Sequence, residues 1–89
     1  MIQAQLLDKP LLTDVGRIAR EVGNTPLVRM DFLSNDRVEV FAKAEWMQLS
    51  GSVKARAAYH IIRRAVIQGW LHRGRRLLDA SSGNTAIAY

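Results

Sequence analysis

An alanine- and isoleucine-rich segment that follows Ser50-Gly51-Ser52 constrains the fold of this chain more than any other stretch. It runs from Val53 to about Gln68, consists largely of good helix formers and contains no proline, so it predicts an α-helix. Ser52 is the expected N-cap, because its hydroxyl can accept a hydrogen bond from a first-turn amide. We therefore expect the rest of the chain to be arranged around this helix.

Lys54 occupies an unusual position for a lysine. It falls in the first turn of the predicted helix, where the positive end of the helix dipole disfavours a cation. At about 100° per residue it shares a face with Ala58, Ile61 and Ala65, which is the spacing of a buried stripe. Both effects favour the neutral amine, the form that Schiff-base formation with a carbonyl cofactor requires. The alternative is a lysine whose aliphatic stem packs on the core while its amine reaches solvent.

The composition is that of one small globular domain. The chain has 89 residues, of which 48% are hydrophobic and 24% charged. It contains no cysteine, which excludes disulfides and thiolate metal sites, and His60 and His72 lack suitable partners, so no metal site is expected. The first residues lack the basic start and apolar core of a signal peptide, and no apolar run approaches the ~20 residues of a membrane span. A soluble, cytoplasmic protein is expected.

The net charge of +5 raises the question of nucleic-acid binding. Few aromatic side chains apart from Trp70 accompany the basic residues, and no zinc-finger or RNA-binding signature is present. A solvated basic face, which could also attract an anionic metabolite, is the favoured interpretation. A small basic nucleic-acid-binding module remains the alternative. It would use five arginines that lie within fourteen residues, namely Arg63, Arg64, Arg73, Arg75 and Arg76.

The first part of the chain predicts an arm, a helix and a short strand. Residues 1–12 are expected to form an N-terminal arm, because a proline interrupts them and their leucines show no clear period. Residues 13–22 predict a short helix with Thr13 as its N-cap, and the glycine and proline that follow end it. Residues 27–30 predict a short strand.

Three later segments have the order strand, helix, strand. Residues 38–45 alternate apolar and polar side chains, as a strand does, and the helix at 53–68 follows. Residues 75–80 predict a second strand, in which Leu77 and Leu78 are both apolar, as in a strand covered on both faces. Such a βαβ unit predicts parallel pairing with a right-handed crossover.

The second predicted strand runs into a loop of small polar residues and then into another helix that begins at Ala86. The loop consists of Ser81, Ser82, Gly83, Asn84 and Thr85. A helix N-terminus after such a loop forms an anion site at the carboxyl end of a parallel sheet. Ordinary capping explains the same residues equally well. Because only two parallel strands are present and the last helix stops soon after it begins, we expect a chain cut off within an element.

Four motifs occur in order along the sequence: Gly23-Asn24-Thr25-Pro26-Leu27-Val28, Lys43-Ala44-Glu45-Trp46, Gly51-Ser52-Val53-Lys54 followed by Arg56, and Ser82-Gly83-Asn84-Thr85. Together they resemble the start of the cysteine synthase and cystathionine β-synthase family, pyridoxal-phosphate enzymes of the tryptophan synthase β-like fold (fold type II). The resemblance runs from about residue 18 to the end. It implies an α/β fold of which this chain holds an incomplete βαβ portion, with residues 13–89 as the N-terminal portion of the enzyme domain, truncated at its C-terminus.

The resemblance also implies roles for particular residues. Lys54 would form the Schiff base with pyridoxal 5'-phosphate and then take and return protons as the catalytic base. Asn84 would lie near the cofactor's ring hydroxyl. The substrate's carboxylate would be bound by Ser81, Ser82, Gly83, Asn84 and Thr85. The implied reaction is β-elimination from an activated serine, followed by addition of sulfide or a thiol. Threonine synthase and the serine and threonine dehydratases, which share the fold, are the alternatives among enzymes.

The sequence departs from the family pattern at several positions. Gln48-Leu49 replaces a usual Asn-Pro, Ala55 replaces a frequent Asp, and Ala86 replaces a glycine. Neither the family's glycine-rich phosphate loop nor its partner for the pyridine nitrogen occurs in this sequence. The isolated chain is therefore expected to be inactive, and a family-type homodimer is expected only with the missing C-terminal part.

Overall fold

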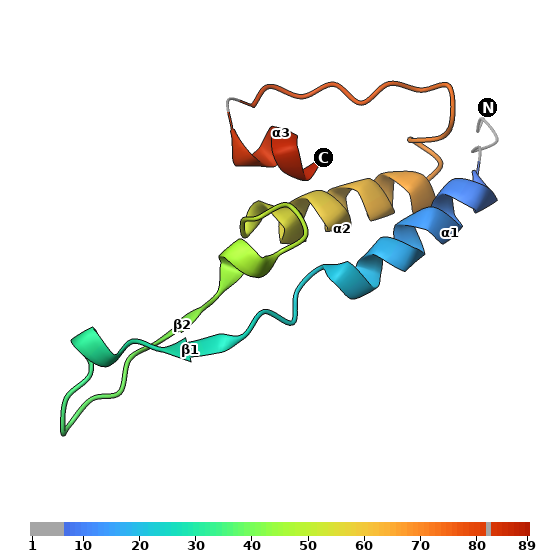
Figure 1. The fold of residues 1–89 in the computed structure, drawn as a ribbon. Helices are drawn as coiled ribbons and strands as arrows, with labels where there is room; N and C mark the ends of the chain where they lie inside the picture. Colours follow the sequence, from blue (N-terminus) through green and yellow to red (C-terminus); the bar gives the residue numbers. More distant parts are fainter. Residues whose placement is uncertain (1–6, 82) are drawn as a thin grey trace.

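The computed structural model describes residues 7–81 and 83–89. Three helices gather at one end of the molecule, and a β-hairpin extends away from them (Figure 1). The molecule measures 64 × 26 × 22 Å and has a radius of gyration of 17.7 Å, against about 12 Å for a compact domain of this length. The elements are α1 (Lys9–Ile18), β1 (Leu27–Arg29), β2 (Phe41–Lys43), α2 (Lys54–Ile67) and α3 (Asn84–Ala88), with 3₁₀ turns at Ala19–Glu21, Asp31–Leu33 and Glu45–Met47.

Helix α1 begins earlier than the sequence pattern predicted. Asp8 is its N-cap and accepts a hydrogen bond from the Leu11 amide at 2.9 Å. Pro10 lies in the first turn, where a missing N–H costs nothing. The prediction of Thr13 as N-cap is wrong, because Thr13 lies inside the helix and its hydroxyl donates to the Lys9 carbonyl at 3.0 Å. The last residues of the predicted arm thus belong to α1, and the arm's residues 1–6 lie outside the described part of the chain.

Helix α2 confirms the central helix predicted from the sequence. Its buried residues are Ala55, Ala58 and Val66, so the face turned to the core shares Ala58 with the predicted stripe but not the rest of it. Lys54 and Ile61, which were expected on that face, are both exposed. Helices α1 and α3 both contact α2, and the small apolar core lies around these contacts. Its buried members are Val15, Ala44, Ala55, Ala58 and Val66.

The sheet topology differs from the prediction, because the two strands form an antiparallel hairpin. Strands β1 and β2 pair antiparallel, with Val28 opposite Ala42. The parallel pairing predicted for residues 38–45 with residues 75–80 is wrong for the described structure, because 75–80 form no strand and Leu78 is 94% exposed. An antiparallel partner is available through a short connection, whereas a parallel strand needs cover on both of its faces. The described elements therefore form a partial α/β structure without a parallel sheet.

Candidate active site

Glu45 lies at the centre of a polar cluster that joins three separate segments of the chain. Its carboxylate accepts two hydrogen bonds from Arg56, from Nε to Oε2 at 3.0 Å and from Nη2 to Oε1 at 2.9 Å. The Thr25 hydroxyl donates to Oε1 at 2.7 Å, and the Gln48 side-chain amide donates to Oε2 at 2.7 Å. Each carboxylate oxygen thus has two donors. We call Thr25, Glu45, Gln48 and Arg56 the Glu45 cluster.

The cluster also fixes the turn that follows α1. The Gln48 side-chain oxygen accepts a hydrogen bond from the Gly23 amide at 2.8 Å, and the Lys43 ammonium donates to the Thr25 carbonyl. Gly23 has a φ of +86°, and a Cβ at this position would lie 3.2 Å from Arg56 Nη1. A glycine is therefore favoured here both by the backbone conformation and by the space available. The turn is held against the start of α2 by side chains rather than by a sheet.

The charges of the cluster stabilise each other. Hydrogen bonds from Arg56, then from Gln48 and Thr25, hold the pKa of Glu45 at about 2, below its ordinary value of 4.5. The same carboxylate raises the pKa of Arg56. Thr25 and Gln48 are buried, so the hydrogen bonds that they make are shielded from competing water. Glu45 is consequently ionised at neutral pH, and the bidentate pair with Arg56 has the geometry expected of a strong ion pair.

Lys54 is the first residue of α2, and its side chain is exposed. Its amide donates to the Ser52 hydroxyl at 3.3 Å, so the predicted contact of Ser52 with the first turn is present, although Val53 occupies the N-cap position. The prediction that Lys54 points at a buried apolar face is wrong, because Lys54 is exposed, as is Ile61 further along the predicted stripe. The alternative orientation, with the amine in solvent, is the one that the structure has.

The predicted 81–85 loop runs into α3, which begins at Asn84 rather than at Ala86 as predicted and has Gly83 at its N-cap position. The Ser81 hydroxyl accepts hydrogen bonds from the Ala86 amide at 3.1 Å and from the Gly83 amide at 3.4 Å. Ordinary capping, one of the two interpretations of this loop, therefore accounts for Ser81. Asn84 is exposed and Thr85 is half-buried, and Ser82 lies outside the described residues. The substrate-binding role of the loop stays a prediction.

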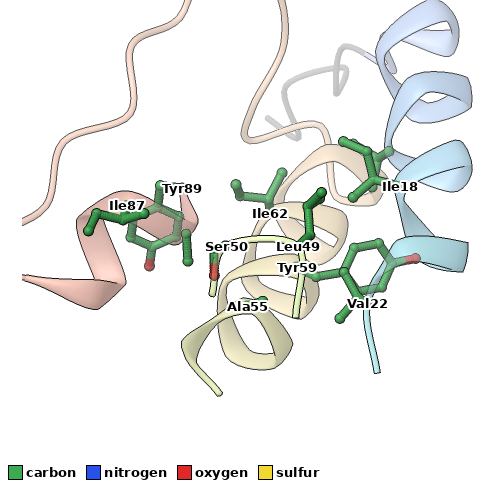
Figure 2. A pocket seen from close by; sticks show the side chains of 11 residues that line it. Ile18, Val22, Leu49, Ser50, Ala55, Tyr59, Ile62, Ile87 and Tyr89 are labelled. Atoms are coloured by element: carbon green, nitrogen blue, oxygen red, sulfur yellow. The ribbon is translucent and has the colours of Figure 1, made fainter. Parts of the chain in front are cut away.

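An apolar cavity of about 310 Å³ is lined by residues close to both predicted site segments, Lys54 and the 81–85 loop. Figure 2 shows Ile87 of α3 and Tyr89, which follows α3, on one side of it, and Ile18 of α1 and Val22 on the other. Ser50, from the loop before Lys54, also lines the cavity. Within the described residues, its hydroxyl oxygen is buried without a hydrogen-bond partner. The structure thus brings the loop before Lys54 and the C-terminal part of α3 to the border of one cavity.

Two departures from the family pattern have structural roles. Gln48 is 4% exposed and uses both ends of its amide group, one on Gly23 and one on Glu45. Ala55 is 5% exposed and packs in the core. The cluster itself was missed by the sequence analysis, although three of the quoted motifs contain Thr25, Glu45 and Arg56. Opposite charges in two of those motifs, Glu45 at a strand end and Arg56 at a helix start, were the available signal.

The basic residues are partly neutralised within the chain. Arg73 lies 3.9 Å from an Asp8 carboxylate oxygen and 3.7 Å from one of Asp14, and its amide donates to Asp8 at 2.9 Å. Arg75 donates to the Trp70 carbonyl at 3.3 Å. These contacts remove part of the proposed basic face, and no observation favours the nucleic-acid-binding alternative.

Comparison with known proteins identifies the family. A family model described as "Pyridoxal-phosphate dependent enzyme" matches residues 18–89. The chain belongs to this family. Its members depend on pyridoxal phosphate, which confirms the cofactor that the motifs implied. In the part of the chain that the structure describes, no helix is long and apolar enough to cross a bilayer.

Curated relatives support the resemblance to cysteine synthases. The chain is 42% identical over 67 residues to cysteine synthase 1 of Neurospora crassa, covering 74% of this chain and 18% of that protein. It is 46% identical over 72 residues to cysteine synthase B of Pseudomonas syringae, covering 80% and 43%. It is 44% identical over 68 residues to N-(2-amino-2-carboxyethyl)-L-glutamate synthase of Ralstonia nicotianae, covering 75% and 20%. The chain therefore spans less than half the length of each of these relatives. No significant match to a solved structure is found.

Proposed function

We propose that this chain supplies the cofactor lysine and the substrate-carboxylate loop of an enzyme that carries out cysteine synthase-like β-replacement. The observation that carries the proposal is the position of Lys54, the first residue of α2, with an exposed side chain. An exposed amine can reach an aldehyde. Among the described residues, Lys54 forms no ion pair that would have to be broken. The residues present therefore fit a cofactor that carries an aldehyde.

Each proposed site residue has a defined task. Bound pyridoxal phosphate supplies an electron sink for the electron pair left at the substrate's α-carbon. Lys54 would hold the cofactor and, once the substrate's amine has displaced it, would take the α-proton as the β-substituent leaves and return a proton to the α-carbon as the nucleophile adds to the β-carbon. Asn84 contacts the cofactor. The substrate carboxylate is bound by amides and side chains of Ser81, Ser82, Gly83, Asn84 and Thr85.

A second candidate differs in the nucleophile. The relative from Ralstonia nicotianae is named for a product in which a 2-amino-2-carboxyethyl group is carried on glutamate nitrogen. Its identity to this chain, 44%, is similar to that of the cysteine synthases. Addition of an amino group to the same activated serine is therefore the alternative to addition of sulfide or a thiol. Both candidates use the same lysine and the same carboxylate loop.

The lysines of the chain allow a direct test, because there are only three of them: Lys9, Lys43 and Lys54. The chain is incubated with pyridoxal phosphate, reduced with borohydride, and mapped by peptide mass spectrometry. We expect the adduct mainly on Lys54 and its loss in Lys54→Ala. Lys43, which donates to the Thr25 carbonyl, serves as the internal comparison. An adduct mainly on Lys9 or Lys43 contradicts the proposal.

Catalysis by residues 1–89 alone is not expected. The sequence contains no recognisable phosphate loop, so the cofactor would be held mainly by a bond that water hydrolyses. Elimination from O-acetylserine by the purified chain with added cofactor is the assay. Turnover above that of free pyridoxal phosphate, abolished in Lys54→Ala, would contradict this expectation. A cytoplasmic location and a family-type homodimer of a longer enzyme also remain predictions from the sequence.

A further inference from the structure

The start of α2 has weak local capping interactions. Its N-cap position is occupied by Val53, whose side chain makes no capping hydrogen bond, and its first turn contains no acidic residue. The Ser52 hydroxyl accepts from the Lys54 amide at the long distance of 3.3 Å. Lys54 itself is a cation at the positive end of the helix dipole. Local interactions therefore do little to fix where this helix begins or how its first residue is oriented.

The Glu45 cluster supplies a tertiary anchor at the same place. Arg56 lies two residues after Lys54, in the first turn of α2, and both of its hydrogen bonds to Glu45 are formed by a planar guanidinium. A two-point contact fixes direction as well as distance. Glu45 is fixed in turn by Thr25 and Gln48. The first turn of α2 is thus attached to the turn at Gly23 through side chains that are hydrogen-bonded to one another.

We propose that Glu45, Gln48 and Arg56 are positioning residues for Lys54: the cluster holds the first turn of α2 so that the Lys54 amine is presented in one place to an aldehyde cofactor. This inference rests on the proposed function of Lys54. A nucleophile gains most from a supporting shell that removes alternative orientations before the reaction. Gln48 belongs to that shell because its side-chain amide group bridges the Gly23 amide and the Glu45 carboxylate.

Two variants test the role of the cluster, each with a matched control. Arg56→Lys keeps the charge and removes the two-point contact, and Arg63→Lys makes the same change at an exposed position of the same helix. Gln48→Asn keeps the amide and shortens its reach. Val66→Ala weakens the core of α2 without touching the cluster. Circular dichroism establishes that each variant keeps its helices, and where Arg56→Lys loses them, Gln48→Asn carries the test.

The readouts are the ratio of borohydride-trapped adduct on Lys54 to that on Lys9, and hydrogen exchange of the first-turn amides of α2. In Arg56→Lys we expect the ratio to fall about threefold to tenfold, as for the loss of one hydrogen bond of ordinary strength, and the first-turn amides to exchange faster. A smaller change in the same direction is expected for Gln48→Asn. Arg63→Lys and Val66→Ala should keep the parental ratio.

Two different failures can be told apart. A parental chain with no preference for Lys54 contradicts the proposed function. A parental preference that survives both Arg56→Lys and Gln48→Asn contradicts the positioning role and leaves the proposed function standing. A fall of equal size in Val66→Ala also overturns the positioning role, because general loss of stability would then explain the effect.

Discussion

The two ends of the β1–β2 hairpin are held by different kinds of contact. At the root, the Glu45 cluster ties the hairpin to α2, and Ala44 is fully buried. At the tip, the Asn35 side chain accepts from the amides of Arg37 and Val38 at 2.9 and 3.0 Å. Yet Phe32, in the tip, is 78% exposed. Polar groups are therefore paired at both ends, whereas apolar side chains are buried only at the root.

The contrast shows that a short segment can pair its own polar groups but cannot bury its own apolar side chains. A hydrogen bond needs one nearby atom, and a turn supplies it from its own residues. Burial needs a second layer packed against the first. The root has α2 as that layer, and the described chain places none against the tip. Substitutions at the root should therefore affect stability more than substitutions at the tip.

The largest effect is expected for Arg56→Leu, which leaves the Glu45 carboxylate without its cation. Removing one partner of such a pair is more harmful than losing the pair, because the remaining charge keeps its desolvation cost. We expect the melting temperature to fall more than in any other variant considered below. Arg63→Leu, at an exposed position of the same helix, should have little effect. Equal melting temperatures for the two variants would contradict the importance of the root.

The root should also give stability a dependence on pH. Because the folded-state pKa of Glu45 is lowered to about 2 from 4.5, the ionised carboxylate contributes fully above about pH 4.5, and its contribution is lost as the pH falls toward 2. Urea unfolding followed from about pH 6 to about pH 2 measures this loss. The dependence should become flatter in Arg56→Leu. An unchanged slope in that variant would assign the pH dependence to other carboxylates.

Gly23→Ala is expected to have the next largest effect. Its positive φ costs a residue with a Cβ about 1–2 kcal/mol, and the new methyl group also meets Arg56 Nη1 at 3.2 Å. Gly51→Ala is the control, since Gly51 has a φ of +84° and nothing within 4 Å of the added Cβ. The difference in free energy of unfolding between the two variants measures the contact with Arg56. No difference would mean that Arg56 moves aside freely.

Val66→Ala should destabilise the helical end by about 1–2 kcal/mol, the cost of removing buried methyl groups and leaving a small cavity. Val66 is fully buried, whereas Val38 at the hairpin tip is 52% exposed. Val38→Ala removes the same atoms from the tip and should change the free energy of unfolding much less. Denaturant unfolding of both variants gives the comparison, and equal losses would show that the tip is packed in solution.

The smallest effect on stability is expected for Phe32→Ser at the tip, within about 0.5 kcal/mol. Its effect on association should be larger, because exposed apolar patches promote self-association. Sedimentation velocity of the parental chain and of the variant tests this. A parental chain that is monomeric at high concentration would contradict the expectation that the tip promotes self-association.

Helix α2 was predicted correctly because its signals are local. Good helix formers, the absence of proline and the serine before Lys54 lie within the segment itself. The start of α1 was placed too late for a related reason, since Asp8 and Pro10 form an N-cap and first-turn pair as good as the one assigned to Thr13. Where two local signals compete, the sequence alone does not rank them.

The parts that could not be predicted depend on distant residues. Residues 75–80 contain two adjacent leucines, as a strand covered on both faces does, but a strand forms only beside a partner, and none of the described strands lies beside them. In the Glu45 cluster, Thr25 is 20 residues from Glu45 and 31 from Arg56. These residues belong to separate motifs of the family resemblance, and the contact between them is visible only in the structure. Lys54 could be singled out from its place in the helix, but its exposure could not.

The Glu45 cluster also determines where this chain tolerates recombination with a relative. Glu45, Gln48 and Arg56 lie within a segment of twelve residues, so a crossover on either side of it transfers carboxylate, amide and guanidinium as one inherited block. The partners left behind are the Gly23 amide and the Thr25 hydroxyl. A crossover inside the block separates Glu45 from Arg56, and each charge must then find a new counterpart in the foreign half of the chimera.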